Sequence, residues 1–116
     1  MELSWKAIAA AAVLLAVGYL LMRSGGDVSV EEAQRLVREG ATLVDVRTRS
    51  EFAAGHIEGA VNIPVQELDG RAGELGAREK PLVLYCRSGA RSSRAASRLK
   101  EQGFTQVHDL GAMSRW

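Results

Sequence analysis

The sequence predicts an α/β fold in which a central parallel sheet is flanked by helices and preceded by one apolar helix. Two short apolar runs, at residues 42–46 and 82–85, have the length and composition of buried strands. Helical patterns alternate with such runs, which is typical of chains that build parallel sheets. The third observation is an uncharged run at residues 7–22. We therefore divide the chain into an N-terminal anchor and linker, residues 1–26, and a domain, residues 27–116.

The domain elements are expected to alternate between helices and strands. Ser29 begins a Ser-x-x-Glu capping box, and Gly40 marks the end of the helix that follows. Pro64 ends a short strand, and Gly70 and Gly73 interrupt a weak helix. After the first helix the expected elements are a strand at 42–46, a short helix at 50–54, a short strand at 60–63, an interrupted helix at 66–75, a strand at 82–85, a helix at 90–102 and a strand at 105–109.

The composition limits the classes of function. The 116 residues include 15 Lys and Arg against 14 Asp and Glu, which gives a formal net charge of +1. This balance lacks the basic excess of nucleic-acid-binding proteins, so we expect no nucleic-acid partner. One cysteine and two histidines do not make a metal site, and no intramolecular disulfide can form. Any oxidised or persulfidated form of the cysteine must therefore be discharged by an outside thiol or acceptor.

The N-terminal segment has the composition of a single membrane-spanning helix over residues 3–22. Lys6 lies near its start, where it can extend to the interface, and Trp5 and Tyr19 suit the two interfaces. A cleaved signal peptide is disfavoured because the residues after the apolar run are bulky where a cleavage site needs small ones. We expect a single-pass membrane protein, and the distribution of basic residues favours a cytoplasmic over a periplasmic domain.

Cys86 stands where the apolar run at 82–85 meets a short loop that leads into a helical pattern. Free backbone N–H groups at a helix start favour an anion, and a thiolate is such an anion. Arg87 and Arg91 lie close by in the sequence and favour the thiolate further. The alternative is a buried structural cysteine, since free cysteine also behaves as a small apolar residue. The pattern favours a reactive thiol but does not define its reaction.

Four stretches of the chain, in the same order and spacing, resemble the motifs of single-domain rhodaneses. The loop CRSGARS at residues 86–92 is similar to the active-site loop of that family. The other three are LVDVR at 43–47, EFAAGHIEGAVNIP at 51–64 and DLGAMSRW at 109–116. The last one departs from the usual pattern, because Ala112 stands in place of a glycine. On these motifs the domain is identified as a member of the rhodanese-like sulfurtransferases.

The resemblance implies a thiosulfate sulfurtransferase with a rhodanese-like sheet. Cys86 would take sulfane sulfur from a small anionic donor such as thiosulfate, hold it as a persulfide and pass it to a thiophilic acceptor, either cyanide or a thiol. A protein sulfur acceptor is a further expected partner. No cofactor or metal is implied. The residues implied in substrate binding are Arg87, Ser88, Gly89, Ala90, Arg91 and Ser92.

Other residues of these motifs are interpreted as scaffold. Asp45 and Arg47 are expected to tie adjoining loops together, with Glu51 as a partner of Arg47, and His56 is expected to be structural because an ionised thiolate needs no base.

Two other functions remain open at this point. Arg91 lies five residues after Cys86, whereas phosphatases and arsenate reductases of the same fold place it six residues after, so these activities are disfavoured. The second alternative is a non-catalytic, membrane-tethered binding or sulfur-relay module.

Overall fold

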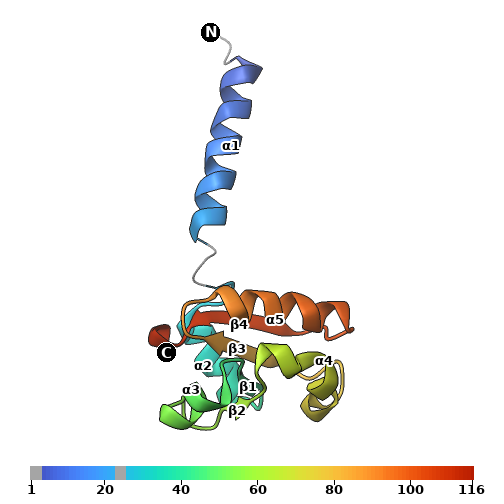
Figure 1. Cartoon of the computed structure of the whole chain (residues 1–116). Helices are drawn as coiled ribbons and strands as arrows, with labels where there is room; N and C mark the ends of the chain where they lie inside the picture. Colours follow the sequence, from blue (N-terminus) through green and yellow to red (C-terminus); the bar gives the residue numbers. More distant parts are fainter. Residues whose placement is uncertain (1–3, 23–25) are drawn as a thin grey trace.

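A four-stranded parallel sheet forms the centre of the domain (Figure 1). The structure is a computed structural model that describes residues 4–22 and 26–116. The strands are β1 (Thr42–Asp45), β2 (Val61–Asn62), β3 (Leu82–Cys86) and β4 (Val107–Ala112), in the spatial order β2-β1-β3-β4. Each neighbouring pair is parallel, as the sequence predicted. Because β3 lies inside the sheet, its carboxyl end lies between β1 and β4. Ligands bind at the carboxyl ends of the strands in sheets of this kind.

Helices cover both faces of this sheet. The helices of the domain are α2 (Val30–Arg38), α3 (Arg49–Ala54), α4 (Leu68–Arg71) and α5 (Ala90–Glu101), with 3₁₀ turns at Val65–Glu67, Ala72–Leu75 and Met113–Arg115. Side chains alternate along β3 because successive residues of a strand point to opposite faces. Leu84 and Cys86 pack on the side of α5, and Tyr85 packs on the side of α2. Cys86 is therefore held in the core by its own strand.

The observed elements differ from the expected ones where glycine breaks the pattern. The weak helix expected at 66–75 is divided into α4 and two 3₁₀ turns, since Gly70 and Gly73 disfavour a continuous helix. The last strand lies at Val107–Ala112 and not at 105–109. Ser29 caps α2 as expected, accepting the Glu32 N–H at 3.1 Å.

The predicted membrane anchor is wrong. Helix α1 (Trp5–Met22) has 18 residues and contains the uncharged run. Within residues 4–22 and 26–116, no helix is both long enough and apolar enough to span a membrane. This finding overturns the single-pass span over residues 3–22 and the cytoplasmic orientation derived from it. Residue 3 and the linker positions 23–25 lie outside the described residues, and the domain boundary after residue 26 stays a prediction.

Residues 26–28 run beside β4 and join the segment that precedes α2 to the last strand. The backbone N–H of Asp27 donates to the Asp109 carbonyl at 2.8 Å, and the Asp109 N–H donates to Asp27 Oδ1 at 2.7 Å. Gly26 has a φ of +106°, and a Cβ placed there would lie 2.4 Å from the Asp109 carbonyl oxygen. Only glycine therefore allows the chain to approach β4 so closely.

Candidate active site

Cys86 lies at the carboxyl end of β3, fully buried, and the loop at residues 87–89 connects it to α5. The loop turns at Gly89, the N-cap of α5, whose φ of +109° and ψ of −22° are left-handed. This conformation points the Gly89 N–H back at Cys86, where it donates to Sγ at 2.9 Å. The sulfur is thus fixed against a backbone donor in front of a helix, as the sequence indicated. A backbone donor in this position stabilises negative charge on sulfur.

Ser92, in the first turn of α5, supplies a second polar contact to the sulfur. Its side chain is fully buried, and its hydroxyl accepts the Cys86 thiol hydrogen bond at a Sγ–Oγ distance of 3.4 Å. The same hydroxyl donates to the Gly89 carbonyl at 3.1 Å. Ser92 therefore links the nucleophile to the turn that shapes the loop.

Arg91 is held by a carboxylate of α3. Its Nη1 and Nη2 donate to the two oxygens of Glu51 at 2.6 Å and 2.9 Å. The Arg91 guanidinium and the Thr48 backbone N–H together lower the pKa of Glu51 to about 2. Thr48 caps α3 in a reciprocal capping box with Glu51, which the sequence analysis did not identify. The expected pairing of Glu51 with Arg47 is therefore wrong, and the Arg91 charge is neutralised within the protein.

Arg47 forms a buried ion pair with Asp45, the last residue of β1. Arg47 Nε and Nη2 donate to the Asp45 carboxylate, with the shortest contact at 2.6 Å, and Nη2 also donates to the Gly55 carbonyl at 2.7 Å. Hydrogen bonding to Asp45 raises the pKa of Arg47. Asn62 donates to the carbonyls of both Asp45 and Arg47 at 2.9 Å. These contacts join the loop after β1 to the loop after α3, in agreement with the predicted scaffold role.

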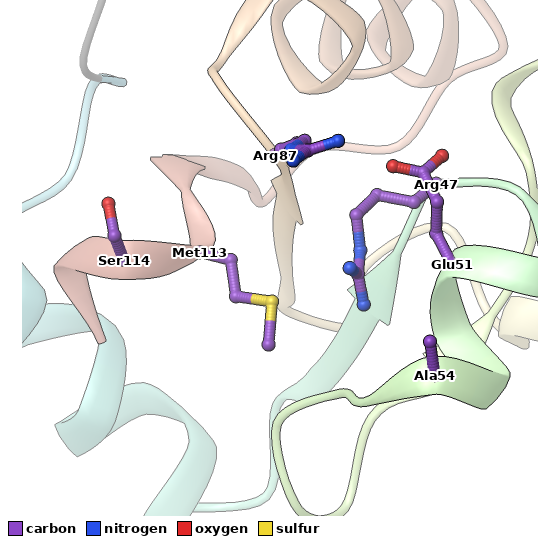
Figure 2. A pocket seen from close by; sticks show the side chains of 6 residues that line it. All are labelled: Arg47, Glu51, Ala54, Arg87, Met113 and Ser114. Atoms are coloured by element: carbon purple, nitrogen blue, oxygen red, sulfur yellow. The ribbon is translucent and has the colours of Figure 1, made fainter.

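A pocket of about 530 Å³ opens beside this network (Figure 2). Its lining residues are Arg47, Glu51, Ala54, Arg87, Met113 and Ser114. Figure 2 shows the Met113 side chain pointing toward the middle of the pocket, across from Arg47 and Glu51. Of the predicted substrate-binding residues, Arg87 alone lines this pocket. Met113 and Ser114 belong to the C-terminal motif, which identified the family resemblance but gave no hint that this turn faces the site.

Arg87 and Arg91 differ in their availability to an anion. Arg87 is exposed, and among the described residues it forms no ion pair. Arg91 is occupied by Glu51. The two arginines appeared equivalent in the sequence, but of these two only Arg87 lines the pocket without an ion pair among the described residues.

The histidines lie outside the pocket lining. His56 Nδ1 lies 2.8 Å from the Phe52 carbonyl oxygen, and its ring stacks on the Phe52 ring at a centroid distance of 3.7 Å. Both contacts agree with the structural role expected for His56. In the part of the chain that the structure describes, no group of His, Cys, Asp and Glu side chains could hold a metal ion.

Comparisons with known proteins agree with this architecture. A family model described as a rhodanese-like domain matches residues 29–116. A sulfurtransferase of Allochromatium vinosum is 40% identical over 86 residues, which cover 72% of this chain and 79% of that protein. The human thiosulfate:glutathione sulfurtransferase is 36% identical over 110 residues, which cover 82% of this chain and 96% of that protein.

A solved structure also resembles this chain in its fold. A human single-domain sulfurtransferase matches with a TM-score of 0.69 and 36% identity, over 77% of this chain and 92% of that chain. With its parallel sheet, its cysteine loop ahead of α5 and these relatives, the chain belongs to the rhodanese-like domain family.

Proposed function

We propose that the protein is a sulfurtransferase that moves sulfane sulfur through a persulfide on Cys86. The observation that carries this proposal is the 2.9 Å contact from the Gly89 N–H to Cys86 Sγ at the start of α5. A preformed donor in this position stabilises a sulfur anion without any rearrangement during the reaction. The exposed Arg87 at the adjoining pocket suits an anionic donor such as thiosulfate.

The first half-reaction loads the cysteine. The Cys86 thiolate attacks the outer sulfur of thiosulfate, the S–S bond of the donor breaks, and its electron pair leaves with sulfite. Cys86 then bears a persulfide whose terminal sulfur is an anion. The amide of Gly89 and its neighbours in the loop supply hydrogen-bond donors to this sulfur.

The second half-reaction removes the terminal sulfur from the Cys86 persulfide. An acceptor thiolate, or cyanide, attacks the terminal sulfur, and the Cys86 thiolate leaves. The products are an acceptor persulfide, or thiocyanate, and the free enzyme. Because the chain has a single cysteine, the acceptor comes from outside it. The activity named for the human thiosulfate:glutathione relative favours a small thiol in this role.

The proposal is tested by the intact mass of the full chain after exposure to thiosulfate. We expect a gain of one sulfur atom on the wild-type protein, no gain on Cys86→Ser, and loss of the added sulfur with formation of thiocyanate after cyanide is added. Cys86→Ser replaces the sulfur with a smaller oxygen and retains the loop, so it is the matched control. If neither thiosulfate nor a persulfide donor adds sulfur to the wild-type protein, the catalytic proposal is wrong and a binding role takes its place.

Arg87→Ala is expected to raise KM for thiosulfate by about two- to fivefold and to leave kcat nearly unchanged, because an exposed charge pair contributes about 0.2–1 kcal/mol. Steady-state thiocyanate formation at low ionic strength measures both constants. Arg94→Ala removes an equal charge from the exposed surface of α5 and serves as the control. An equal change in KM for the two variants would mean that the overall charge, and not the position of Arg87, attracts the donor.

A further inference from the structure

Glu51 lines the pocket, and the proposed reaction gives it no part. Its partner Arg91 lies in the first turn of α5, and Gly89 before it and Ser92 after it both contact the Cys86 sulfur. A guanidinium presents parallel N–H donors that match an oxyanion, so a free arginine in this turn would suit one. Here both donors are given to the Glu51 carboxylate, at 2.6 Å and 2.9 Å. The carboxylate thus takes the place that the oxygens of a substrate anion would occupy.

Thr48 holds this carboxylate in a fixed orientation. The Thr48 backbone N–H and hydroxyl both donate to Glu51 Oε1, at 3.1 Å and 3.0 Å. With a pKa of about 2, Glu51 is ionised throughout the neutral range. To reach Arg91, an anion from solution would have to displace a carboxylate that is already charged and hydrogen-bonded on the protein side, which is costly. The ion pair is therefore built to persist when a substrate enters.

Glu51, and not Arg91, is the member of the pair that lines the pocket. Figure 2 shows the Glu51 side chain extending from α3 at the edge of the pocket, so an entering anion meets a carboxylate at this wall. The Arg91 side chain is 27% exposed and would be open to a small anion if Glu51 released it. Arg47, which also lines the pocket, is held by Asp45 in the same way. The site is rich in arginine and yet offers little of that charge to a ligand.

We propose that Glu51 is a specificity-determining residue that, by holding Arg91, keeps the affinity of the pocket for doubly charged oxyanions low. Two ions of this class matter for the reaction. Sulfite is the leaving group of the first half-reaction, and sulfate has the shape of thiosulfate without its transferable sulfur. While Arg91 is held, sulfite leaves readily and sulfate does not fill the site. The consequence for turnover rests on the proposed function; the affinity of the free protein for sulfate does not.

The test is the dissociation constant of sulfate, measured by isothermal titration calorimetry on the full chain at constant ionic strength, with no sulfur donor present. Glu51→Gln removes the charge and retains the capping box, in which glutamine can replace glutamate. We expect sulfate to bind about tenfold more tightly to this variant, since a charge-assisted hydrogen bond from the released guanidinium contributes about that factor. A merely structural role of Glu51 would leave sulfate binding unchanged or weaken it, and either result would overturn the proposal.

The double variant Glu51→Gln, Arg91→Gln tests the route through Arg91. It removes the pair as a neutral unit, so its sulfate affinity is expected to lie within about twofold of the wild type, because coupled residues are not additive. A gain that persists without Arg91 would mean that the carboxylate merely repels anions, against the proposed route. The double variant also decides the matter if Glu51→Gln alone does not fold. A fall of about fivefold or more below the wild type would mean that Arg91 binds oxyanions despite Glu51, and the proposal would be wrong.

Glu67→Gln is the matched charge control. The Glu67 side chain is also partly exposed, and it pairs with Arg49 and Arg71, neither of which lines the pocket. The change removes the same charge and releases an arginine on the surface. Solvent screens such a charge, so sulfate affinity is expected to change by less than about twofold. An equal gain for Glu67→Gln and Glu51→Gln would assign the effect to overall charge and overturn the proposal.

Inhibition of thiocyanate formation by sulfite links the result to sulfur transfer. The apparent inhibition constant is expected to fall about tenfold in Glu51→Gln and to stay within about twofold in Glu67→Gln. A gain in sulfate affinity without this fall would overturn the assignment of Glu51 to the sulfur-transfer site. If the protein transfers no sulfur at all, the proposed function fails, while sulfate binding still decides whether Glu51 controls the affinity of the pocket for oxyanions.

Discussion

Asp45→Ala is expected to lower the free energy of unfolding by about 3–5 kcal/mol, because it leaves the buried Arg47 guanidinium without its partner. The Asp45 side chain is fully buried, and that of Arg47 is only 8% exposed. The change removes the acceptor of the Arg47 backbone N–H as well as of its side chain. A small domain is stable by about 5–15 kcal/mol, so this loss is a large fraction of the total. Urea unfolding monitored by circular dichroism measures it.

Two further variants separate the buried pair from ion pairs in general. Asp69→Ala breaks an exposed pair with Arg98 and is expected to cost less than about 1 kcal/mol. Adding Arg47→Met to Asp45→Ala removes the unpaired charge and should recover part of the lost stability, because a buried pair replaced by apolar groups is often close to neutral. Equal costs for Asp45→Ala and Asp69→Ala would contradict the importance given to the buried network.

Gly89→Ala is expected to slow persulfide formation by about tenfold to a hundredfold, since misplacing a preorganised donor is costly to an anionic intermediate. Gly89 combines a φ of +109° with the N–H that donates to Cys86 Sγ. An alanine in the left-handed region costs about 1–2 kcal/mol, and the loop relaxes by rotating that N–H away from the sulfur. The rate of sulfur uptake from thiosulfate, followed by intact mass, measures the effect.

Gly40→Ala provides the matched control. Gly40 has a φ of +107°, almost that of Gly89, and a Cβ placed there would meet nothing within 4 Å. It follows α2, far from the cysteine loop in the sequence. Both variants are expected to lose similar stability, and only Gly89→Ala should lose sulfur uptake at a temperature where both are folded. Similar uptake in the two variants would remove the Gly89 amide from the proposed mechanism.

The sequence predicted the parts of the fold that local pattern determines. The apolar run that becomes β3 identified a strand buried on both faces, and Ser29 marked the start of α2. The last strand was placed too early in the chain, at 105–109, because Gly111 breaks the apolar pattern of its second half, although Gly111 is buried in the fold. The uncharged run at 7–22 suggested a membrane span, but among the described residues no helix is both long enough and apolar enough to span a membrane.

For the candidate site, too, the sequence predicted the features that depend on local pattern and missed those that depend on distant contacts. The position of Cys86 followed from a strand, a glycine turn and a helix start, all within a few residues. Arg87 and Arg91 appeared alike because their difference depends on Glu51, which lies 40 positions from Arg91. The contact of Met113 with the pocket depends on how the turn after β4 folds back. Such pairings depend on tertiary structure, which no local pattern encodes.

The joining of residues 26–28 to β4 has a consequence for the order of folding. Asp27 and Asp109 are hydrogen-bonded across 82 positions, as are Gln34 and the Trp116 carbonyl. Contacts this distant in the sequence slow folding, because a long loop must close before they form. On the ribosome, α2 and β1 emerge while β4 has yet to be made. A nascent chain thus holds Cys86 on a strand without its final neighbour, and the thiol acquires its complete surroundings only when the sheet closes.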